Sequence, residues 1–413
     1  MIGDQFHLIA LPWLVLQLTG DGFATGSVLA AASIPRALFM LLGGAVTDRL
    51  SPRLVMLASN IARMVLSVII GWLVLGGGIE MWMIYVLALT FGVSDAFFYP
   101  AQLAILPRVV TPDLLPAGNA LQHGGYQLSL FVGPALAGLL IAGFSSSDMN
   151  IGPDGGGLES SGLADQKGIA YAFLLDAVTF LASAVTLLAL RISDESGIAP
   201  NVRGRAMLTN IWDGITAAWA DRPLRLFLIL LGLDSLLTTG PISVGIPVLA
   251  HDRFVEGALA LGAITSMKGM GALLGSLLAG LWPPTARWFG PVTLTALGGP
   301  GVCLVIMAFV PDMVDAAVLA FIMGVSGGYF LIVAVVWLQA RTPGAMMGRV
   351  MSLVMLAVVG LAPISQSLSG MLIDLNLEVL FVAAGTSIAL FSLGMLLFSP
   401  TVKAMGDLPK NIS

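Results

Sequence analysis

Charged side chains are scarce in this chain. Only 10% of its 413 residues are Asp, Glu, Lys or Arg, whereas 57% are hydrophobic. A soluble protein carries about 25% charged residues, because water must solvate its surface. A chain with so little charge must present apolar surface to another medium, and a lipid bilayer fits this composition. The net charge of −5 and the lack of a basic stripe exclude a nucleic-acid partner.

Cysteine and histidine are scarce as well. Cys303 is the single cysteine, which excludes a disulfide framework within the chain, and its apolar surroundings indicate a small buried residue. The three histidines, His7, His123 and His251, show neither zinc-ligand spacing nor the pattern of a Ser-His-Asp triad. We therefore expect no metal site, no cofactor and no enzyme. His7 and His123 fall in apolar segments, where each could relay protons or serve only as a hydrogen-bonded structural side chain.

Long apolar runs make up most of the chain. A helix that crosses a bilayer needs about 20 mostly apolar residues, and such runs recur along the whole sequence, separated by short turns rich in Gly, Pro or Asp. The sequence therefore predicts an all-α membrane protein of about twelve transmembrane helices. We place these helices near residues 1–19, 23–46, 54–77, 81–107, 116–143, 169–190, 224–250, 257–281, 289–310, 314–340, 346–372 and 377–399.

The uneven distribution of the 18 Lys and Arg residues predicts an orientation. If both termini are cytoplasmic, the outer loops hold only Lys167 and Arg253. Three more basic residues, Arg36, Arg63 and Lys268, lie deep inside spans. All the others then fall in inner loops, at the inner ends of spans or in the C-terminal tail. This positive-inside bias predicts a multi-pass protein with both termini in the cytoplasm.

The two halves of the chain resemble each other. Residues 91–94 (Phe-Gly-Val-Ser) match residues 323–326 (Met-Gly-Val-Ser) at an offset of 232, and Arg36 and Lys268 share that offset. Repeats of this kind predict two pseudo-symmetric six-helix bundles. The predicted domains are an N-terminal bundle (1–190), a cytoplasmic linker (191–223), a C-terminal bundle (224–399) and a cytoplasmic tail (400–413).

The predicted linker carries an amphipathic pattern. A helix of this kind can lie along the membrane interface or pack on its own protein, and the sequence leaves both possibilities open. The hydrophobic residues at helical spacing are Leu208, Ile211, Trp212, Ile215 and Trp219.

Seven charged residues fall inside the predicted spans and away from the loops that join them. A charge at the bilayer centre costs at least about 2.5–3.5 kcal/mol, so these residues are candidates for function. At about 1.5 Å per residue, Asp234 and Lys268 lie at similar depth near the midplane. Asp4 and Arg36 repeat this arrangement in the first two spans. We therefore expect two acid–base pairs beside a central cavity, in which protonation of the acid releases its partner; pairs that only support packing are the alternative. The seven residues are Asp4, Arg36, Arg63, Asp95, Asp176, Asp234 and Lys268.

The segment between the second and third spans has a distinctive spacing: Gly44, three residues, Asp48-Arg49, three residues, Arg53. It resembles the signature loop of the major facilitator superfamily. The resemblance implies a conformational switch in which Asp48 meets the N-terminus of a helix in the other half, near residues 346–349. The helix dipole favours a negative charge there by about 0.3–1 kcal/mol. An ordinary cluster of positive-inside charge is the alternative.

The fifth span carries Ser129, Gly133, Pro134 and Gly138. This pattern resembles the Gly-Pro motif of the superfamily's drug–proton antiporters, which implies close helix packing and a bend at the proline. Generic small-residue packing is the alternative. Such antiporters often carry an arginine in the fourth span, but here that span offers only Asp95. A proton-coupling scheme based on that arginine therefore does not carry over.

Two further stretches narrow the resemblance. Residues 3–13 (GDQFHLIALPW) and 97–101 (FFYPA) are similar to bacterial exporters of the macrolide-efflux and enterobactin-exporter type. The resemblance implies a monomeric secondary transporter of the bacterial cytoplasmic (inner) membrane. It would export a hydrophobic or amphipathic small molecule, such as a drug, macrolide or siderophore-like compound, by alternating access and proton antiport. Uptake, lysophospholipid translocation and a non-transporting membrane sensor are the alternatives.

The first predicted span has no Lys or Arg before it. Relatives of the exporter type carry a short basic segment and several more apolar residues at this point. We expect that the natural start lies upstream of Met1 or that the first helix is short at its inner end.

Overall fold

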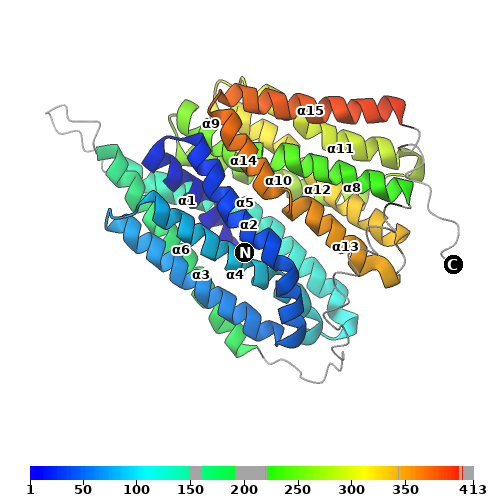
Figure 1. Ribbon diagram of the computed structural model, residues 1–413, viewed down its shortest axis with the longest axis horizontal. Helices are drawn as coiled ribbons and strands as arrows, with labels where there is room; N and C mark the ends of the chain where they lie inside the picture. Colours follow the sequence, from blue (N-terminus) through cyan, green and yellow to red (C-terminus); the bar gives the residue numbers. More distant parts are fainter. Residues whose placement is uncertain (148–159, 191–218, 220, 343, 400–401, 403–413) are drawn as a thin grey trace. The chain divides into compact units, whose positions relative to one another are not determined.

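The computed structural model describes residues 1–147, 160–190, 219, 221–342, 344–399 and 402, and the structural statements below refer to these residues. Every regular element within them is helical, which confirms the predicted all-α class (Figure 1). The first helices are α1 (Ile2–Thr19), α2 (Gly22–Arg49), α3 (Pro52–Leu75), α4 (Met81–Val109), the 3-10 turn η1 (Pro112–Leu114), α5 (Leu115–Ser147) and α6 (Ser160–Ala189). The later ones are α8 (Arg222–Gly240), the π-helical turn η2 (Pro241–Gly245), α9 (Ile246–Arg253), α10 (Ala258–Leu281), α11 (Ala286–Met307), α12 (Met313–Arg341), α13 (Gly344–Val359), α14 (Ala362–Ile373) and α15 (Leu377–Phe398).

The number of membrane spans agrees with the sequence prediction. Among the described residues, 11 helical stretches are long and apolar enough to cross a bilayer. The 18-residue helix α1 is a further apolar helix, so the expectation of about twelve spans is confirmed. Most helices begin and end within a few residues of the predicted spans. The exception is α6, which begins at Ser160 rather than near residue 169. Most of the predicted linker, including four of its five amphipathic positions, lies outside the described residues.

Turn residues end the helices in the way their chemistry suggests. Gly20 has a φ of 62° and closes α1, because glycine adopts this left-handed conformation without strain. Asp312 begins α12, where its carboxylate accepts hydrogen bonds from the backbone N–H groups of Val314 (2.9 Å) and Asp315 (3.0 Å). Such caps satisfy backbone groups that have no partner within the helix.

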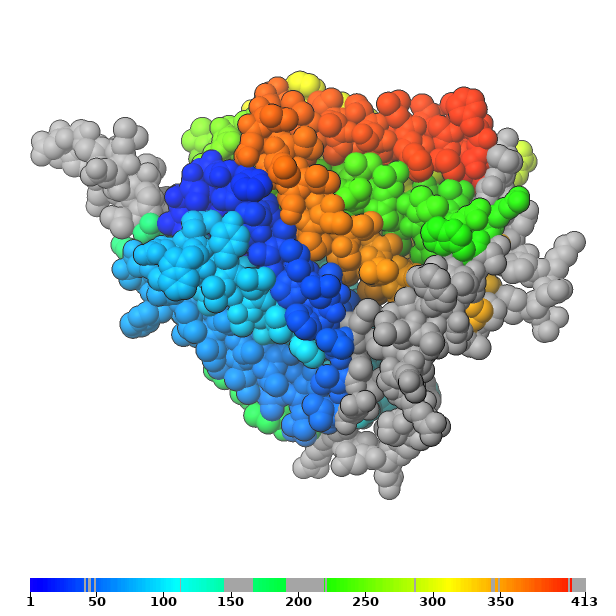
Figure 2. All heavy atoms as spheres, in the orientation of Figure 1, coloured from blue at the N-terminus to red at the C-terminus, as the bar shows by residue number. Residues whose placement is uncertain are grey.

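Two predicted spans are interrupted. The seventh runs through α8, the π-helical turn η2 and α9, and the eleventh is divided between α13 and α14. Proline at position 241 has no N–H to donate, which favours a break there. Helix α14 stabilises this break: the Ser365 hydroxyl donates to the carbonyl oxygen of Leu236 (2.7 Å) and accepts from the backbone N–H of Gly240 (2.7 Å). Figure 2 shows α8 in green beside α13 and α14 in orange.

The chain divides into two compact units. Unit 1 comprises Met1–Asn201 and Ile246–Ser266, and unit 2 comprises Val202–Gly245 and Met267–Ser413. Unit 1 thus includes α9 and the first part of α10, which the predicted boundaries assign to the C-terminal bundle. The predicted division into 1–190 and 224–399 stays a prediction.

Specific contacts explain why α9 and the start of α10 belong to unit 1. The His251 ring meets the edge of the Trp13 ring in α1, with 5.6 Å between centroids. Helix α10 also approaches α5 very closely. A Cβ atom added to Gly138 would lie 2.7 Å from the carbonyl oxygen of Ala258 and 2.9 Å from the Cα atom of Gly262. Only glycine permits this approach of two backbones.

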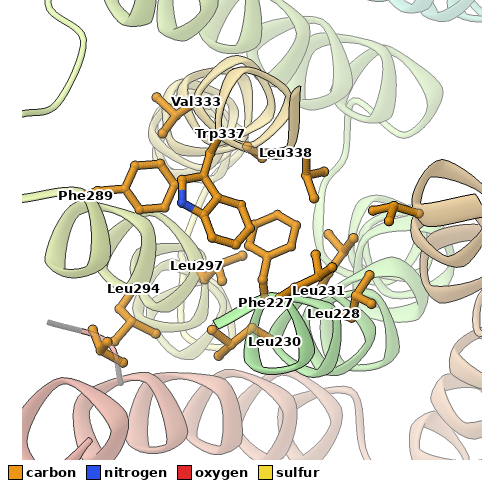
Figure 3. Packing of buried hydrophobic residues seen from close by; sticks show 14 of the residues in the cluster. Phe227, Leu228, Leu230, Leu231, Phe289, Leu294, Leu297, Val333, Trp337 and Leu338 are labelled. Carbon is orange, nitrogen blue, oxygen red and sulfur yellow. The ribbon is translucent and has the colours of Figure 1, made fainter. Parts of the chain in front are cut away.

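Unit 2 has an aromatic core between α8, α11 and α12 (Figure 3). The Trp337 ring of α12 lies 5.1 Å from the Phe227 ring and 5.4 Å from the Phe289 ring. Phe330 adds a further ring 6.0 Å from Phe227. Leucines of α8 and α11 fill the space around these rings. Such packing holds the helices by close apolar contact, as expected where lipid supplies no hydrophobic driving force.

Candidate functional site

Arg63 of α3 is the centre of an intramembrane charge network in unit 1. Its side chain is only 2% exposed. One terminal nitrogen donates to Asp95 Oδ1 on α4 (2.9 Å) and to Asp4 Oδ1 on α1 (3.3 Å). The other terminal nitrogen donates to Asn60 Oδ1, one turn earlier on α3 (2.9 Å). A single buried guanidinium group thus connects three helices.

Arg36 of α2 completes this network. Its guanidinium group donates to Asp95 Oδ2, so Asp95 is bound by two arginines, one at each oxygen. The four charged side chains, Asp4, Arg36, Arg63 and Asp95, are named the charge network below. Two acids offset two bases, which lowers the cost of placing ions within the membrane. Exposure differs among them: Arg36 is 41% exposed, Asp4 32% and Asp95 18%.

The expected pairing of Asp4 with Arg36 is wrong in this structure. Arg36 binds Asp95 and Asp4 binds Arg63. The reason is the close crossing of α2 and α4, where a Cβ atom added to Gly92 would overlap the carbonyl oxygen of Ala32. This crossing brings α4 beside Arg36. Depth along a helix, which the sequence reveals, does not determine the direction in which a side chain points.

Aromatic rings surround the buried part of the charge network. The Arg63 guanidinium carbon lies 4.0 Å from the centre of the Phe98 ring and 4.6 Å from that of Phe180, which are cation–π distances. The buried His7 ring stacks on Phe91 with 3.9 Å between centroids and an interplanar angle of 9°. No hydrogen-bond partner for His7 Nδ1 lies among the described residues. Aromatic stacking therefore positions His7 in this structure.

A polar stripe on α3 joins α3 to α6. Asn60 donates to the Ser183 hydroxyl (2.8 Å), and the Ser67 hydroxyl donates to Asp176 Oδ2 (2.9 Å). Arg63 lies between these two pairs along α3. The sequence interpretation included Arg63 and Asp176 but missed Asn60, Ser67 and Ser183. The spacing 60, 63, 67 on an apolar helix was the available signal, since it places three polar side chains on one face.

The signature segment lies at the end of α2 and the start of α3. Gly44, Asp48 and Arg49 are in the helical backbone of α2, and the side chains of Asp48 and Arg49 lie outside the described atoms. Arg53 donates to the carbonyl oxygen of Leu188 at the end of α6 (2.6 Å). The proposed switch contact of Asp48 near residue 349 stays a prediction.

The Gly-Pro segment of α5 lies against two other helices of unit 1. A Cβ atom added to Gly133 would lie 2.5 Å from Gln5 Cβ of α1. One turn later, Gly138 faces α10 as described above. The Ser129 hydroxyl donates to the carbonyl oxygen of Gly125 within α5 (2.8 Å). Pro134 exposes its carbonyl oxygen to α10, 2.6 Å from a Cβ atom added to Gly262.

Asp234 of α8 and Lys268 of α10 both belong to unit 2. Both side chains are partly buried. No ion pair within 4 Å joins them in the part of the chain that the structure describes. Asp234 neighbours Ser235, whose hydroxyl donates to the carbonyl oxygen of Val358 on α13 (2.8 Å). A direct or water-bridged Asp234–Lys268 contact in another conformation stays a prediction.

The geometry defines a class of protein: a multi-pass helical membrane protein with buried, mutually compensating charges. Among the described residues, no group of three or more His, Cys, Asp or Glu side chains could hold a metal ion. The family model of the Major Facilitator Superfamily matches residues 1–367, and the chain therefore belongs to this superfamily. It is a membrane transporter and not an enzyme, as the sequence interpretation expected.

Relatives extend along most of the chain. The multidrug efflux pump Tap of Mycolicibacterium fortuitum is 26% identical over 384 residues, covering 90% of this chain and 86% of that protein. The Tap pump of Mycobacterium tuberculosis is 25% identical over 387 residues, covering 90% and 84%. The MFS-type transporter y4rN of Sinorhizobium fredii is 24% identical over 411 residues, covering 97% and 92%.

Solved structures show the same fold. The nucleoside transporter NupG superposes with a TM-score of 0.66 at 12% identity, covering 98% of this chain and 100% of that one. The inward-open structure of the xylose transporter XylE from E. coli gives a TM-score of 0.67 at 13% identity, covering 97% and 93%. At such low identity the likeness shows the fold alone.

Proposed function

We propose that this transporter exports hydrophobic or amphipathic small molecules in exchange for protons, as a monomer in a bacterial cytoplasmic membrane. Both chain ends would lie in the cytoplasm. The similarity to two multidrug efflux pumps supports export and a drug-like substrate. The intramembrane charge network supports proton coupling. Charges at this depth are costly, and proteins keep them mainly where function requires them.

The main support for proton coupling is that Asp4 and Asp95 are bound unequally. Asp95 accepts hydrogen bonds from two arginines, one at each oxygen. Asp4 receives one side-chain contact, from Arg63 at 3.3 Å, and its other oxygen lies 3.0 Å from the Met1 amino group. Asp4 is also the more exposed acid. We therefore assign Asp4 as the proton carrier, because water reaches it and its arginine contact is the longer one.

Protonation of Asp4 changes the charge balance of the network. The carboxylate takes a proton from water, becomes neutral and loses its ionic attraction to Arg63, which stays bound to Asp95. The network then holds one acid and two bases. An excess positive charge in a medium of low dielectric constant is unfavourable. Movement of α1, or the approach of a substrate, would relieve it, and loss of the proton to water on the other side would restore the balance.

Inverted membrane vesicles test direction and coupling together. In such vesicles the cytoplasmic face points outward and respiration acidifies the lumen. We expect drug-like substrates to accumulate in the lumen, and each addition of substrate to reduce the pH gradient. A protonophore should abolish both effects. Accumulation in right-side-out vesicles instead would favour uptake, and flipping of lysophospholipid without a pH response would favour lipid translocation.

Asp4→Asn tests the assigned carrier. The substitution removes the titratable group but retains an oxygen that faces Arg63. We expect substrate binding to persist and proton-driven accumulation to fall at least tenfold. Asp374→Asn, at an exposed position after α14, is the matched control and should transport normally. Normal proton-coupled transport by Asp4→Asn would contradict the assignment, and no transport of any compound by the native chain would favour the sensor hypothesis.

A further inference from the structure

Asp176 of α6 is a buried acid that does not belong to the charge network. Its side chain is 0% exposed, as is that of Ser67, its hydrogen-bond donor on α3. The Ser67 hydroxyl donates to Asp176 Oδ2 at 2.9 Å. Asp176 Oδ1 has no hydrogen-bond partner among the described residues, and no Lys or Arg side chain there lies within ion-pair distance of this carboxyl.

Helix α1 lies directly on this carboxyl. A Cβ atom added to Gly3 would lie 2.7 Å from Asp176 Oδ1 and would overlap the Thr179 hydroxyl oxygen. The absence of a side chain at Gly3 therefore brings the α1 backbone against the oxygen that has no partner. The next residue on α1, Asp4, contacts Arg63. Consecutive residues of α1 thus touch Asp176 and the charge network.

The surroundings of Asp176 favour its neutral form. A carboxylate that is removed from water without a paired cation is strongly disfavoured, and it takes up a proton instead. The charged groups that face it from the helices packed against α6 are Asp4 and the Met1 amino group on α1 and Arg63 on α3. The negative charge of Asp4 opposes a second negative charge, and Arg63 is already engaged by Asp4 and Asp95. Because the Ser67 hydroxyl donates to Oδ2, Oδ1 is the oxygen that can carry the proton.

We propose that Asp176 is a second proton-binding site of this transporter, separate from the charge network and closed by α1. In the present arrangement Oδ1 carries the proton. When α1 moves away from α6, water reaches the carboxyl, the O–H bond at Oδ1 breaks and the proton passes to water, leaving a carboxylate that Ser67 still contacts. The neutral carboxyl stabilises the contact between α1 and α6, because an ionised one would lose its hydration there without a paired cation. The proposal does not rest on the role assigned to Asp4, because the burial of Asp176 and its contact with the Gly3 backbone hold whichever acid carries the transported proton.

Infrared spectroscopy of the purified full chain in lipid tests the protonation state. The C=O stretching band of a protonated carboxyl should be present at neutral pH and should disappear in Asp176→Asn. Ser67→Ala should shift the frequency of this band, because it removes the hydrogen bond to the C=O oxygen. Asp4→Asn should leave the band in place even if it abolishes proton-coupled transport. The proposal would be wrong if no carboxyl band changed in either the Asp176 or the Ser67 variant. If Asp176→Asn does not fold, the frequency shift in Ser67→Ala alone tests whether Asp176 is protonated.

Spin labels on α1 and α6 test the link to helix movement. Leu8 and Val185 are exposed positions on the two helices, and cysteines there can carry the labels once Cys303 is replaced by serine. The label distance should change at the alkaline pH at which the infrared band disappears, and Asp176→Asn should remove this pH dependence. A band that persists while the distance changes would show that the proton does not follow α1, and the proposal would be wrong.

Discussion

Two helix crossings, one in each unit, use glycines at matched positions but different charges. In unit 1, a Cβ atom on Gly92 of α4 would overlap the carbonyl oxygen of Ala32 on α2. In unit 2, a Cβ atom on Gly324 of α12 would overlap the carbonyl oxygen of Lys268 on α10. Gly92 and Gly324 belong to the matched segments of the internal repeat. The repeat offset of 232 matches Lys268 to Arg36. The crossings instead give Lys268 the place that Ala32 has in unit 1, one helical turn before Arg36.

This difference separates packing from chemistry. Both crossings retain the glycine that allows two helices to approach, so helix packing is the property that the two halves share. The charges differ: Arg36 binds Asp95 on the neighbouring helix, whereas the residue that the repeat matches to Asp95 is Gly327, which has no side chain. The sequence match of Arg36 with Lys268 thus does not extend to their surroundings. Unit 1 has a bonded network, and unit 2 has a separated pair.

Removal of the centre of the charge network should have the largest effect on stability. Arg63→Met leaves Asp4 and Asp95 with fewer partners and removes the cation from two aromatic rings. Breaking a buried ion pair costs about 3–5 kcal/mol. We expect a loss of this size, measured by the unfolding of the purified protein in detergent.

The matched control for Arg63→Met is Arg287→Met, at an exposed position near the start of α11. It should change the free energy of unfolding little, because exposed charges contribute about 0–1 kcal/mol. Equal losses in the two variants would show that the network does not stabilise unit 1.

The two acids of unit 1 should differ from each other. Asp95→Asn weakens contacts with two arginines, whereas Asp4→Asn weakens contact with one. A hydrogen bond to a charged group contributes about 1.5–3 kcal/mol. We therefore expect the loss of stability in Asp95→Asn to exceed that in Asp4→Asn by at least about 1.5 kcal/mol, measured by the same unfolding assay. The reverse order would refute the assignment of Asp4 as the less tightly held acid.

Alanine substitutions test the shared packing of the crossings. Gly92→Ala and Gly324→Ala both force two backbones apart, and overpacking costs about 1–3 kcal/mol. Gly327→Ala is the control, since a Cβ atom there meets nothing within 4 Å. It should leave stability unchanged or raise it by up to about 1 kcal/mol, because alanine favours helix more than glycine does. Destabilisation by Gly327→Ala alone would contradict the comparison.

The sequence predicts some levels of this structure better than others. Apolar runs and turn residues give most helices to within a few residues, because length and hydrophobicity decide which segments cross a bilayer. The depths of Asp4 and Arg36 follow from helical rise. Their partners do not, because helices that are apolar on all sides give no signal of which face meets which neighbour. The crossing of α2 and α4, which the sequence does not show, is what brings Asp95 to Arg36.

The smallest expected effect concerns Asp234 and Lys268. The structure shows no direct bond between them in the part of the chain that it describes, so a double-mutant cycle with Asp234→Asn and Lys268→Met should give a coupling energy of about 0.5–1 kcal/mol. The same cycle at Arg63 and Asp95 should give a larger value, because those two groups are hydrogen-bonded.

The double mutant also separates two roles of Asp234 and Lys268. If these two residues only support packing, the double mutant should recover both folding and proton-driven transport, since it leaves no charge without a partner. If Asp234 carries a proton, the double mutant should fold but remain uncoupled. A coupling energy as large as that of Arg63 and Asp95 would show that Asp234 and Lys268 bond directly in the conformation that dominates in the membrane, and the contrast between the two units would then disappear.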